Sequence, residues 1–324
     1  MSRVAVLKGG RALARQVSLR SGARVEDALE RLGHDVVPID VGGDLIAILR
    51  ETGPDVAFVA LHGRDGEDGT IQELLEILGT PYTGSGILAC SRAIDKVLTK
   101  HLMLEAGIPT PPFFAFNQTA FRELGAAKAL PAIEERLDFP IVVKPSSQGS
   151  ALGIKFARTP ADVPAALVAA FSYDGKVLLE RHVEGRDLAV SVLDGAAGAE
   201  ALPVVEAVPS RPQGGQGGAE FYDFEARYEI GSTRFECPAR LEPDALERAH
   251  DLARRAWEAL GCEGFARVDL LSARASGKLT ILDVNIVPGL TGTSLFPQAA
   301  EEAGLSFDDV IARLVDHAFA ASPS

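Results

Sequence analysis

The first 95 residues alternate short apolar runs with helical patterns, and this alternation restricts the fold more than any other feature of the sequence. Three apolar runs have the length and composition of strands: residues 4–7, 36–41 and 56–61. Residues 25–32 and 71–78 show helical spacing of apolar side chains. Strands separated by helices favour a parallel sheet with crossover connections. We therefore predict one α/β unit over residues 1–94.

The rest of the chain divides into two further units that also mix helices and strands, and the predicted fold class is α/β. The second unit, residues 95–180, has a predicted helix over 96–105 and strands over 140–144 and 176–180. The third unit, residues 181–324, has an amphipathic helix over 244–260 and strands over 266–271 and 279–284. Glycines dominate residues 213–218. They indicate either a mobile loop that could close over a site or a plain surface linker.

The composition excludes several classes of protein. The formal net charge is −13 over 324 residues, which argues against general nucleic-acid binding, because that activity needs clustered Lys and Arg to neutralise phosphates. The three cysteines show no CxxC spacing, so we expect small core residues in a reducing compartment rather than disulfides or a zinc site. No apolar run approaches the roughly 18 residues of a membrane span, and the start of the chain lacks a signal-peptide pattern. We therefore expect a cytoplasmic protein without nucleic-acid or membrane partners.

Polar residues on two predicted strands form the first candidate site. Asp283 and Asn285 stand two apart and share one face of a strand, and Asp269 on the preceding strand can add another oxygen. Such hard oxygen ligands suit Mg²⁺ that also binds substrate phosphates, although capping or turn roles are an alternative for each residue alone. Arg267 shares the face of Asp269 and would place a cation beside a phosphate or a developing oxyanion. Gly289 follows the second strand and offers a backbone N–H without side-chain obstruction.

Lysines and carboxylates near strand ends form a second candidate site. Lys144 closes an apolar strand and precedes a loop rich in Ser and Gly, whose backbone N–H groups could wrap phosphate oxygens. The loop does not follow the Walker pattern, and loops of this composition also fill ordinary turns. Lys96 adds a second cation, while Glu180 and Asp187 could accept hydrogen bonds from an adenine amino group or ribose hydroxyls. The simpler alternative for each is a solvated charge.

The sequence HGRDGEDG at residues 62–69 forms the third candidate site. Its glycines permit tight turns before a helix whose N-terminus favours an anionic group. His62 in such a loop is either a hydrogen-bonded structural residue or part of a substrate pocket.

Together these stretches resemble the D-alanine–D-alanine ligase family, in the same order and over essentially the whole chain. The resemblance includes HGRDGEDG at 62–69, RVD at 267–269 and DVNIVPG at 283–289. The other matching stretches are residues 4–10, 17–22, 60–61, 81–86, 95–96, 143–146, 149–150, 221–228 and 237–239. The resemblance implies an ATP-grasp fold, in which an N-terminal parallel α/β domain precedes two ATP-grasp domains that clamp ATP between two sheets.

The resemblance also implies a reaction and a role for each site residue. One D-alanine carboxylate would attack ATP to give an acyl-phosphate. The amine of a second D-alanine would then displace phosphate. The product, a D-alanyl-D-alanine dipeptide, is a peptidoglycan precursor. The nucleotide would be held by Lys96, Lys144, Glu180, Asp187 and Arg227. Two Mg²⁺ ions, or Mn²⁺ in their place, would be bound by Asp269, Asp283 and Asn285. Catalytic roles would fall to Arg267, Gly289, Ser150 and Tyr228, and substrate binding to His62, Tyr222, Ser294, Val17 and Ser18. The family resemblance further suggests a homodimer.

Five residues depart from the family's pattern, and two of them, Ile286 and Val287, replace smaller polar residues. Ala14 stands where the family has a glutamate that receives the ammonium group of the first substrate, and no acidic residue lies between Lys8 and Gln16. Arg227 replaces a lysine, and Asp283 replaces a longer glutamate. The identity of the first substrate is therefore open. The alternatives to D-alanine are another amino or hydroxy acid with the same mechanism, or ATP binding without turnover.

Overall fold

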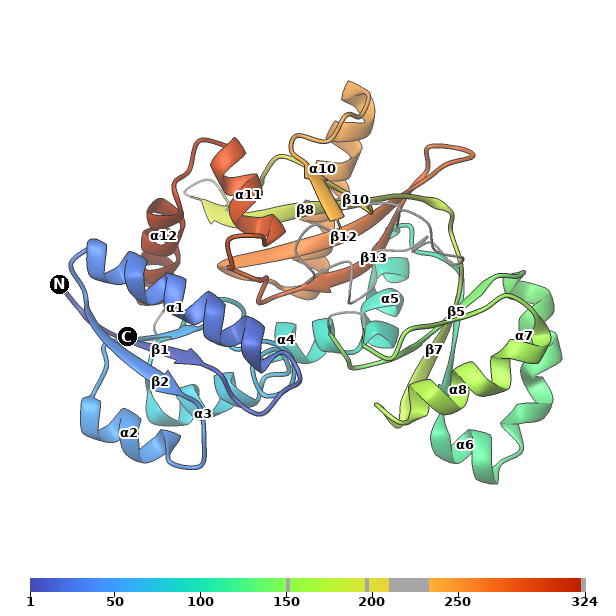
Figure 1. Ribbon diagram of the computed structural model, residues 1–324, viewed down its shortest axis with the longest axis horizontal. Helices are drawn as coiled ribbons and strands as arrows, with labels where there is room; N and C mark the ends of the chain where they lie inside the picture. The colour runs from blue at the N-terminus through green and yellow to red at the C-terminus, as the bar shows by residue number, and fades with distance from the viewer. Residues whose placement is uncertain (150–151, 196–197, 210–232, 322–324) are drawn as a thin grey trace.

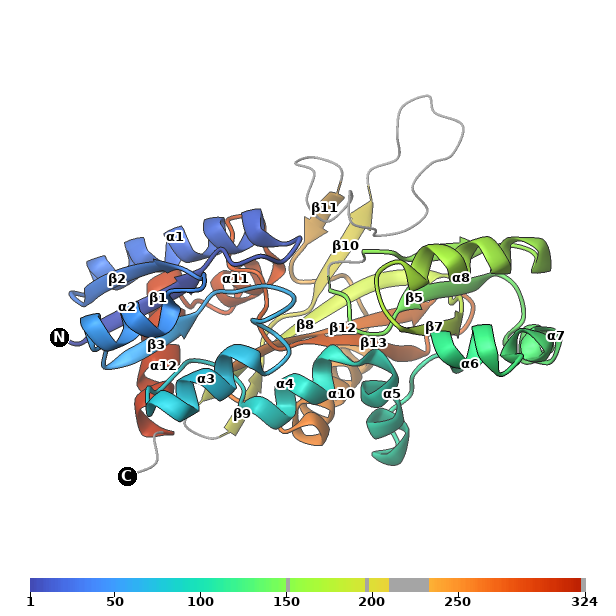
Figure 2. The ribbon, with the colours of Figure 1, turned by 90° about the horizontal axis from the view of Figure 1, so that it is seen from below.

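The structure is a computed structural model, and it describes residues 1–149, 152–195, 198–209 and 233–321. The described residues form three sheets covered by helices. Figure 1 shows the first sheet at one end of the molecule, the sheet within residues 113–181 at the other end, and the sheet within residues 185–285 between them. Figure 2 shows the same order after a turn of 90°, so the three sheets follow one another along the molecule.

The first sheet confirms the parallel arrangement that the sequence predicts. Its strands are β1 (Arg3–Lys8), β2 (Asp35–Asp40) and β3 (Val56–Val59). The order is β2-β1-β3, and both neighbours run parallel to β1. The helices around it are α1 (Arg15–Arg31), α2 (Leu45–Thr52), α3 (Thr70–Leu78) and α4 (Ile87–Ile94). Every residue of β3 is buried, as expected for a parallel sheet with both faces covered.

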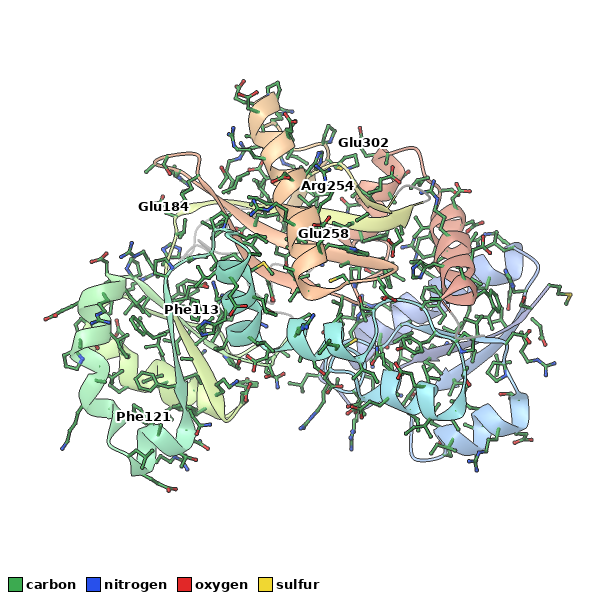
Figure 3. All side chains as sticks on the ribbon, turned by 180° about the vertical axis from the view of Figure 1, so that it is seen from behind. Phe113, Phe121, Glu184, Arg254, Glu258 and Glu302 are labelled. Carbon is green, nitrogen blue, oxygen red and sulfur yellow. The ribbon has the colours of Figure 1, made fainter. Side chains whose placement is uncertain are left out.

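The second sheet is antiparallel and has a core of its own. Its strands are β4 (Phe113–Asn117), β5 (Ile141–Pro145), β6 (Lys155–Ala157) and β7 (Lys176–Arg181), in the order β4-β7-β5-β6. The helices beside it are α6 (Gln118–Glu123), α7 (Leu130–Leu137) and α8 (Val163–Phe171), with 3₁₀ turns at Ala126–Ala129 and Pro160–Asp162. Phe121, labelled in Figure 3, packs against Phe116 and Phe171 in this core. The predicted strands at 140–144 and 176–180 are confirmed as β5 and β7.

The third sheet is also antiparallel and occupies the middle of the molecule. Its strands are β8 (Gly185–Gly195), β9 (Gly198–Ala201), β10 (Val205–Pro209), β11 (Thr233–Glu236), β12 (Phe265–Ala273) and β13 (Leu279–Asn285). The order is β11-β10-β8-β12-β13, and β9 pairs with β8. The helices of this part are α10 (Pro243–Leu260), α11 (Leu295–Glu302) and α12 (Phe307–Ala320). The predicted helix over 244–260 and both predicted strands are confirmed.

The first and third sheets share one hydrophobic core. Side chains from β1 and α1, such as Val4 and Leu29, belong to the same buried cluster as side chains from β8, β12 and α12. The helix α5 (Lys96–Glu105) packs against α10 and β13, and its Met103 joins this core. At the chain's end, α12 packs against α1, where Asp308 forms an ion pair with Arg31. The unit boundaries at residues 95 and 181 stay a prediction. The shared core contains residues from all three predicted units.

Two expectations from composition can be compared with the described residues. Within them, no helix is long and apolar enough to cross a membrane. The three cysteines carry free thiols, with Cys90 and Cys262 buried and Cys237 half-buried. Burial raises the pKa of the Cys237 thiol to about 11, so it is protonated at neutral pH.

Candidate active site between two sheets

The ends of β12 and β13 bring the predicted oxygen ligands together. Asp269 of β12 lies opposite Asp283 of β13, beside a shift in strand register, and Arg267 lies opposite Asn285. The Asn285 amide donates a hydrogen bond to Asp269 Oδ2 at 3.1 Å. Within the described part of the chain, no three His, Cys, Asp or Glu residues form a metal cluster, so the candidate set is two carboxylates and one amide. These hard oxygen donors fit Mg²⁺ that is also held by phosphates.

Arg267 is tied to the same carboxylate. Its guanidinium contacts Asp269 through two nitrogens, Nε to Oδ1 at 2.6 Å and Nη2 to Oδ2 at 2.9 Å. Both side chains are about nine-tenths buried, with 11% exposed. A two-pronged contact of this kind fixes the plane of the guanidinium as well as its position. The sequence prediction that Arg267 and Asp269 share a face is therefore confirmed.

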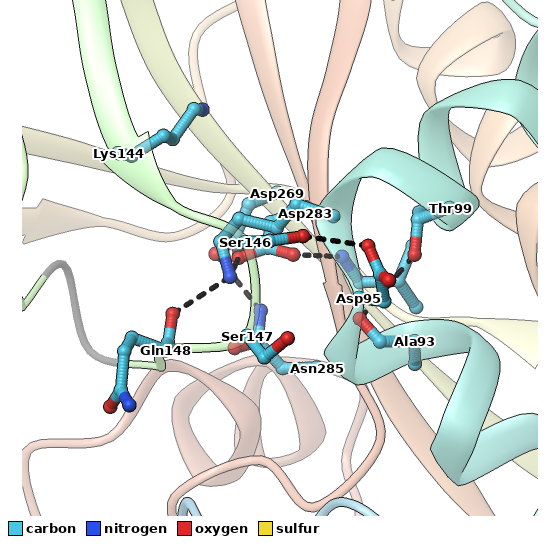
Figure 4. A network of polar contacts seen from close by, with 12 residues as sticks. Ala93, Asp95, Thr99, Lys144, Ser146, Ser147, Gln148, Asp269, Asp283 and Asn285 are labelled. Atoms are coloured by element: carbon cyan, nitrogen blue, oxygen red, sulfur yellow. Dashed lines mark hydrogen bonds and ion pairs between the residues drawn. The ribbon is translucent and has the colours of Figure 1, made fainter. Parts of the chain in front are cut away.

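Lys96 connects the loop after β5 to the carboxylates of β13. Its ammonium donates to the Gln148 carbonyl at 2.8 Å and lies 3.4 Å from Asp283 Oδ2. Asp95, the residue before it, caps α5 and accepts a hydrogen bond from Ser146 Oγ at 2.7 Å. Figure 4 shows part of this network, including the hydrogen bond from Ser146 to Asp95. The second and third sheets are thus joined at the candidate site by a buried cation.

A second buried network surrounds Glu180 at the end of β7. Its carboxylate contacts the ammonium groups of Lys144, at 2.8 Å, and Lys100, and the three side chains are almost fully buried. Burial alone would raise the pKa of Glu180, but the two lysines outweigh it and hold that pKa below the ordinary value. Burial lowers the pKa of Lys100 to about 8, although Glu180 acts in the opposite direction. The cluster carries one positive charge more than negative, which suits a phosphate-bearing ligand.

His62 is held by residues from both ends of the chain. Its Nε2 lies 3.0 Å from Ser21 Oγ, and its Nδ1 lies 3.1 Å from the Val287 carbonyl. Glu67 Oε1 is farther from Nδ1, at 3.6 Å. The side chain of His62 is buried, with only 5% of the residue exposed. The structure therefore places this loop residue against the segment that follows β13.

Gly289 and Ser294 face each other after β13. A Cβ atom added at Gly289 would lie 2.7 Å from Ser294 Oγ, so only glycine fits this approach without a shift. Ser294 begins α11, and its Oγ accepts from the Thr291 N–H at 3.1 Å and contacts Thr291 Oγ1 at 2.8 Å. Ser294, which is predicted to bind substrate, and Gly289, which is predicted to have a catalytic role, are thus neighbours.

A small pocket is lined by some of these groups. Its lining residues are Glu67, Lys96, Gly149, Asp283, Asn285 and Ile286, together with three apolar neighbours. Glu67 comes from the loop at 62–69, and Asp283 and Asn285 come from β13. At least one residue of each of the three candidate sites therefore lines the same pocket.

The structure does not gather every predicted residue there. Asp187 lies half-buried on β8, where it pairs in register with Leu271 of β12. Ser18 is fully buried, and its hydroxyl accepts from the Gly9 N–H and donates to the Ala60 carbonyl, so it joins β1 to β3. Val17 is also buried, in α1. Four predicted residues lie outside the described residues: Ser150, Tyr222, Arg227 and Tyr228.

Ala14 lies where α1 begins. It is the residue before the first turn of the helix, and only 7% of it is exposed. A buried alanine supplies no charge for an ammonium group. Glu67 is the carboxylate of the 62–69 loop that lines the pocket, and its side chain is 16% exposed.

Four residues of the site were not singled out from the sequence: Ser21, Arg24, Glu67 and Lys100. Lys100 follows Lys96 by one helical turn, so its place on the same face was a usable signal. Ser21 and Arg24 contact Leu290, at the far end of the sequence. No local pattern could indicate those contacts.

Comparisons with known proteins agree with this geometry. Residues 102–316 match the family described as D-ala D-ala ligase C-terminus, and residues 47–85 match D-ala D-ala ligase N-terminus. The chain is 43% identical over 314 residues to the D-alanine--D-alanine ligase of Desulforudis audaxviator, covering 97% of both chains. The Bordetella pertussis protein of the same name is 42% identical, with 98% of this chain and 95% of the relative covered.

Solved structures resemble the whole chain. The crystal structure of D-alanine--D-alanine ligase from Bacillus anthracis superposes with a TM-score of 0.84 at 29% identity, covering 99% of both chains. The same enzyme complexed with ATP gives 0.82, again at 29% identity and 99% coverage of both chains. VanG D-Ala:D-Ser ligase from Enterococcus faecalis gives 0.79 at 27% identity, covering 98% of this chain and 99% of that one. The predicted fold of an N-terminal parallel α/β domain followed by ATP-grasp domains is confirmed.

Proposed function

The chain belongs to the D-alanine–D-alanine ligase family, and on this premise we propose that it is an ADP-forming ligase that joins two D-alanine molecules. The observation that carries the proposal is the position of buried Lys96, between the loop after β5 and Asp283 of β13. Lys96 thus puts a cation between the second sheet, which carries Lys144 and Glu180, and the third sheet, which carries the oxygen ligands. Such a layout supports phosphoryl transfer to a carboxylate.

The reaction has two steps, because a carboxylate is a poor electrophile until it is activated. A carboxylate oxygen of the first D-alanine attacks the γ-phosphorus of ATP, the bond to ADP breaks, and an acyl-phosphate forms. The amine nitrogen of the second D-alanine then attacks the acyl carbon and loses a proton. The carbon–oxygen bond to phosphate breaks, and the products are the dipeptide, ADP and phosphate.

Nucleotide binding is the role we assign to the charged groups of the second sheet and its surroundings. Lys144 and Lys96 would neutralise phosphate oxygens, and Glu180 and Asp187 would accept hydrogen bonds from the base or the ribose. Arg227 is assigned to the nucleotide on the family resemblance alone. Because Glu180 keeps Lys100 as a partner, Lys144 can turn toward phosphate without leaving the Glu180 carboxylate unpaired.

Two Mg²⁺ ions, with Mn²⁺ as a substitute, are the cofactors we propose for Asp269, Asp283 and Asn285. When bound, the ions neutralise phosphate charge and so favour phosphoryl transfer. The side chains themselves hold the ends of β12 and β13 together through the Asn285 to Asp269 hydrogen bond. Removing the ions with a chelator should abolish ADP formation, and Mg²⁺ should restore it.

Charge that develops on the acyl oxygen needs donors that are already in place. We assign this role to the Arg267 guanidinium and the Gly289 N–H. Arg267 is oriented by its two contacts to Asp269, so it need not be reorganised during the reaction. The remaining roles follow the family resemblance: Ser150 and Tyr228 in catalysis, and His62, Tyr222, Ser294, Val17 and Ser18 around the substrates.

The test is ADP and phosphate formation by the purified chain with ATP, Mg²⁺ and D-alanine, with the dipeptide identified by mass spectrometry. We expect equal amounts of ADP, phosphate and D-alanyl-D-alanine. No phosphate release above background at high D-alanine would contradict the proposal. Lys144→Ala should bind ATP more weakly, whereas Lys155→Ala, an exposed lysine on the neighbouring strand β6, is the matched control.

Ala14 is the observation that favours a second candidate. Without a carboxylate at this position, the first subsite could accept another amino acid or a hydroxy acid, with the two steps unchanged. A screen of D- and L-amino acids and hydroxy acids for phosphate release separates the candidates. ATP binding with no release for any acid would indicate a homologue without turnover.

A homodimer and a cytoplasmic location complete the proposal. The homodimer follows from the family resemblance, and the location fits the expected use of the dipeptide as a peptidoglycan precursor. Sedimentation velocity of the purified chain tests the dimer, and fractionation of cells that express the tagged chain tests the location.

A further inference from the structure

The segment Val287–Leu290 is held at both ends by residues of the first unit. The Leu290 N–H donates to Ser21 Oγ at 3.2 Å, and the Leu290 carbonyl accepts from Arg24 Nη1 at 2.6 Å. The Val287 carbonyl contacts His62 Nδ1 at 3.1 Å. Pro288 and Gly289 lie between these anchored ends. Since proline has no N–H, Gly289 supplies the single backbone donor between them.

The direction of the hydrogen bonds can be worked out from the backbone groups. The Leu290 N–H can only donate, so Ser21 Oγ accepts there and its own proton is available for His62 Nε2 at 3.0 Å. Nε2 is then the acceptor of the neutral ring, and Nδ1 carries the proton. The Val287 carbonyl can only accept, and Nδ1 is in place to donate to it. One tautomer of His62 therefore satisfies the whole chain of bonds.

The anchors are rigid as well as correctly paired. Ser21 and Leu290 are fully buried, and His62 and Val287 are each 5% exposed. Arg24 is further held over the ring of Phe307, 4.1 Å from its centroid. Buried hydrogen bonds of this kind are costly to break, because the groups left behind stay unpaired. The backbone around Gly289 thus has one position set by α1 and the 62–69 loop.

We propose that Ser21, Arg24 and His62 form a clamp that positions the Gly289 N–H for the acyl oxygen in the second step of ligation, where negative charge develops on that oxygen. In this role His62 is a positioning residue whose two ring nitrogens are both used by the protein, rather than a ligand of the first substrate. The inference rests on the proposed function, because the oxyanion belongs to that reaction. It goes beyond that function by assigning the position of the Gly289 N–H to three residues whose contacts with this segment span 225 to 269 positions of sequence.

The variants are Ser21→Ala, which removes one link of the clamp, and Arg24→Met, which keeps the apolar stem but loses the bond to Leu290. Arg24→Lys restores a donor and should recover part of the loss. Arg20→Met is the matched control, because Arg20 lies one turn earlier in α1, is exposed, and within the described residues donates to the Gln16 carbonyl of its own helix. Each variant is measured with saturating ATP and Mg²⁺ over a range of D-alanine concentrations. Affinity for a dipeptide phosphinate, a tetrahedral analogue of the intermediate, is measured in parallel.

A clamp acts on the transition state, so we expect kcat to fall about tenfold or more in Ser21→Ala and Arg24→Met, while KM for both D-alanine sites changes less than about twofold. Phosphinate affinity should fall by the same factor as kcat/KM, and ATP affinity should stay unchanged. If His62→Asn instead raises KM for the first D-alanine at constant kcat, His62 is a substrate ligand and the clamp is refuted.

Hydrogen exchange of the Leu290 amide tests the clamp without relying on turnover. We expect this amide to exchange at least about tenfold faster in Ser21→Ala than in the wild-type chain, and no faster in Arg20→Met. Unchanged exchange in Ser21→Ala would overturn the clamp. If the wild-type chain formed no ADP with D-alanine while the exchange difference held, the proposed function would fail and the anchoring of Leu290 would stand.

Discussion

Replacing Gly289 by alanine tests whether the close approach of residue 289 to Ser294 is needed to position the Gly289 N–H. The new Cβ would lie 2.7 Å from Ser294 Oγ and 3.5 Å from Ser294 Cβ. The first distance is about 0.7 Å short of ordinary van der Waals contact, which begins near 3.4 Å. Either Ser294 or the backbone of residue 289 must therefore move.

The two responses differ in their consequences. If Ser294 rotates, it gives up its two contacts with Thr291, at 3.1 and 2.8 Å, which costs about 2 kcal/mol at roughly 1 kcal/mol each. With an unfolding entropy of about 2 cal/mol/K per residue over 324 residues, this lowers Tm by about 3 °C. If the backbone moves, the N–H is displaced by several tenths of an ångström. A displacement of that size should lower kcat by about 10- to 100-fold.

Because Ser294 is held by its two contacts with Thr291, we expect residue 289 to be displaced locally between its anchored neighbours, so most of the effect should appear in kcat and little in Tm. The measurements are initial rates of ADP formation at saturating ATP and D-alanine, and thermal unfolding followed by circular dichroism. Gly292→Ala is the control, because an added Cβ there meets nothing within 4 Å and the residue lies in the same loop. It should leave both quantities unchanged.

Making Gly289→Ala in a Ser294→Ala variant shows whether the contact with Ser294 Oγ causes the loss of activity. In Ser294→Ala the Oγ is gone, and the nearest neighbour of the new Cβ is Ser294 Cβ at 3.5 Å, an ordinary contact. Gly289→Ala should then lower kcat by less than about threefold relative to Ser294→Ala alone. An equal loss in both backgrounds, or a Gly289→Ala enzyme with full activity, would refute the reasoning.

Three further outcomes are expected. Because the pKa of Lys100 falls from 10.5 to about 8 on folding, the unfolded chain binds more protons between these values, so this residue adds stability as pH rises. Urea unfolding at pH 7 and 10 should show that wild type gains on the order of 3 kcal/mol relative to Lys100→Met, and equal gains would contradict it. Asp283→Asn should raise the Mg²⁺ concentration for half-maximal rate at least about tenfold, as measured by metal titration of ADP formation. Ala14→Glu should lower KM for the first D-alanine by about 10- to 100-fold in steady-state assays, and an unchanged KM would show that the ammonium is met elsewhere.

Segments with one periodic face could be predicted from sequence, and segments with polar buried faces could not. The apolar pattern is visible in the sequence of the helix at 244–260 and of the strands β5, β7, β12 and β13. By contrast, α1 begins at Arg15, ten residues before the predicted helix. Its first turns bury Ser18 and Ser21, whose hydroxyls bond the Ala60 carbonyl and His62. These serines interrupt the apolar stripe that would have indicated the helix.

In the site, local patterns indicated residue pairs on one strand but not partners from distant elements. Arg267 and Asp269 share a strand face, and their contact followed from alternation. Lys100 could be placed on the helix face of Lys96, but its partners Thr110 and Glu180 come from other parts of the chain. Contacts between α1 and Leu290 depend on how two sheets share one core, which no single segment records.

The packing of α12 against α1 has a consequence for synthesis on the ribosome. About 275 residues separate Arg31, at the end of α1, from Phe307, at the start of α12. At a translation rate of about 5–20 residues per second, α12 is synthesised roughly 14–55 s after α1. The apolar surface that α1 and β1 later bury against the C-terminal part of the chain stays open during that interval. The nascent chain is therefore a natural client for chaperones that cover apolar surface, and truncation shortly before α12 should yield aggregated rather than partly active protein.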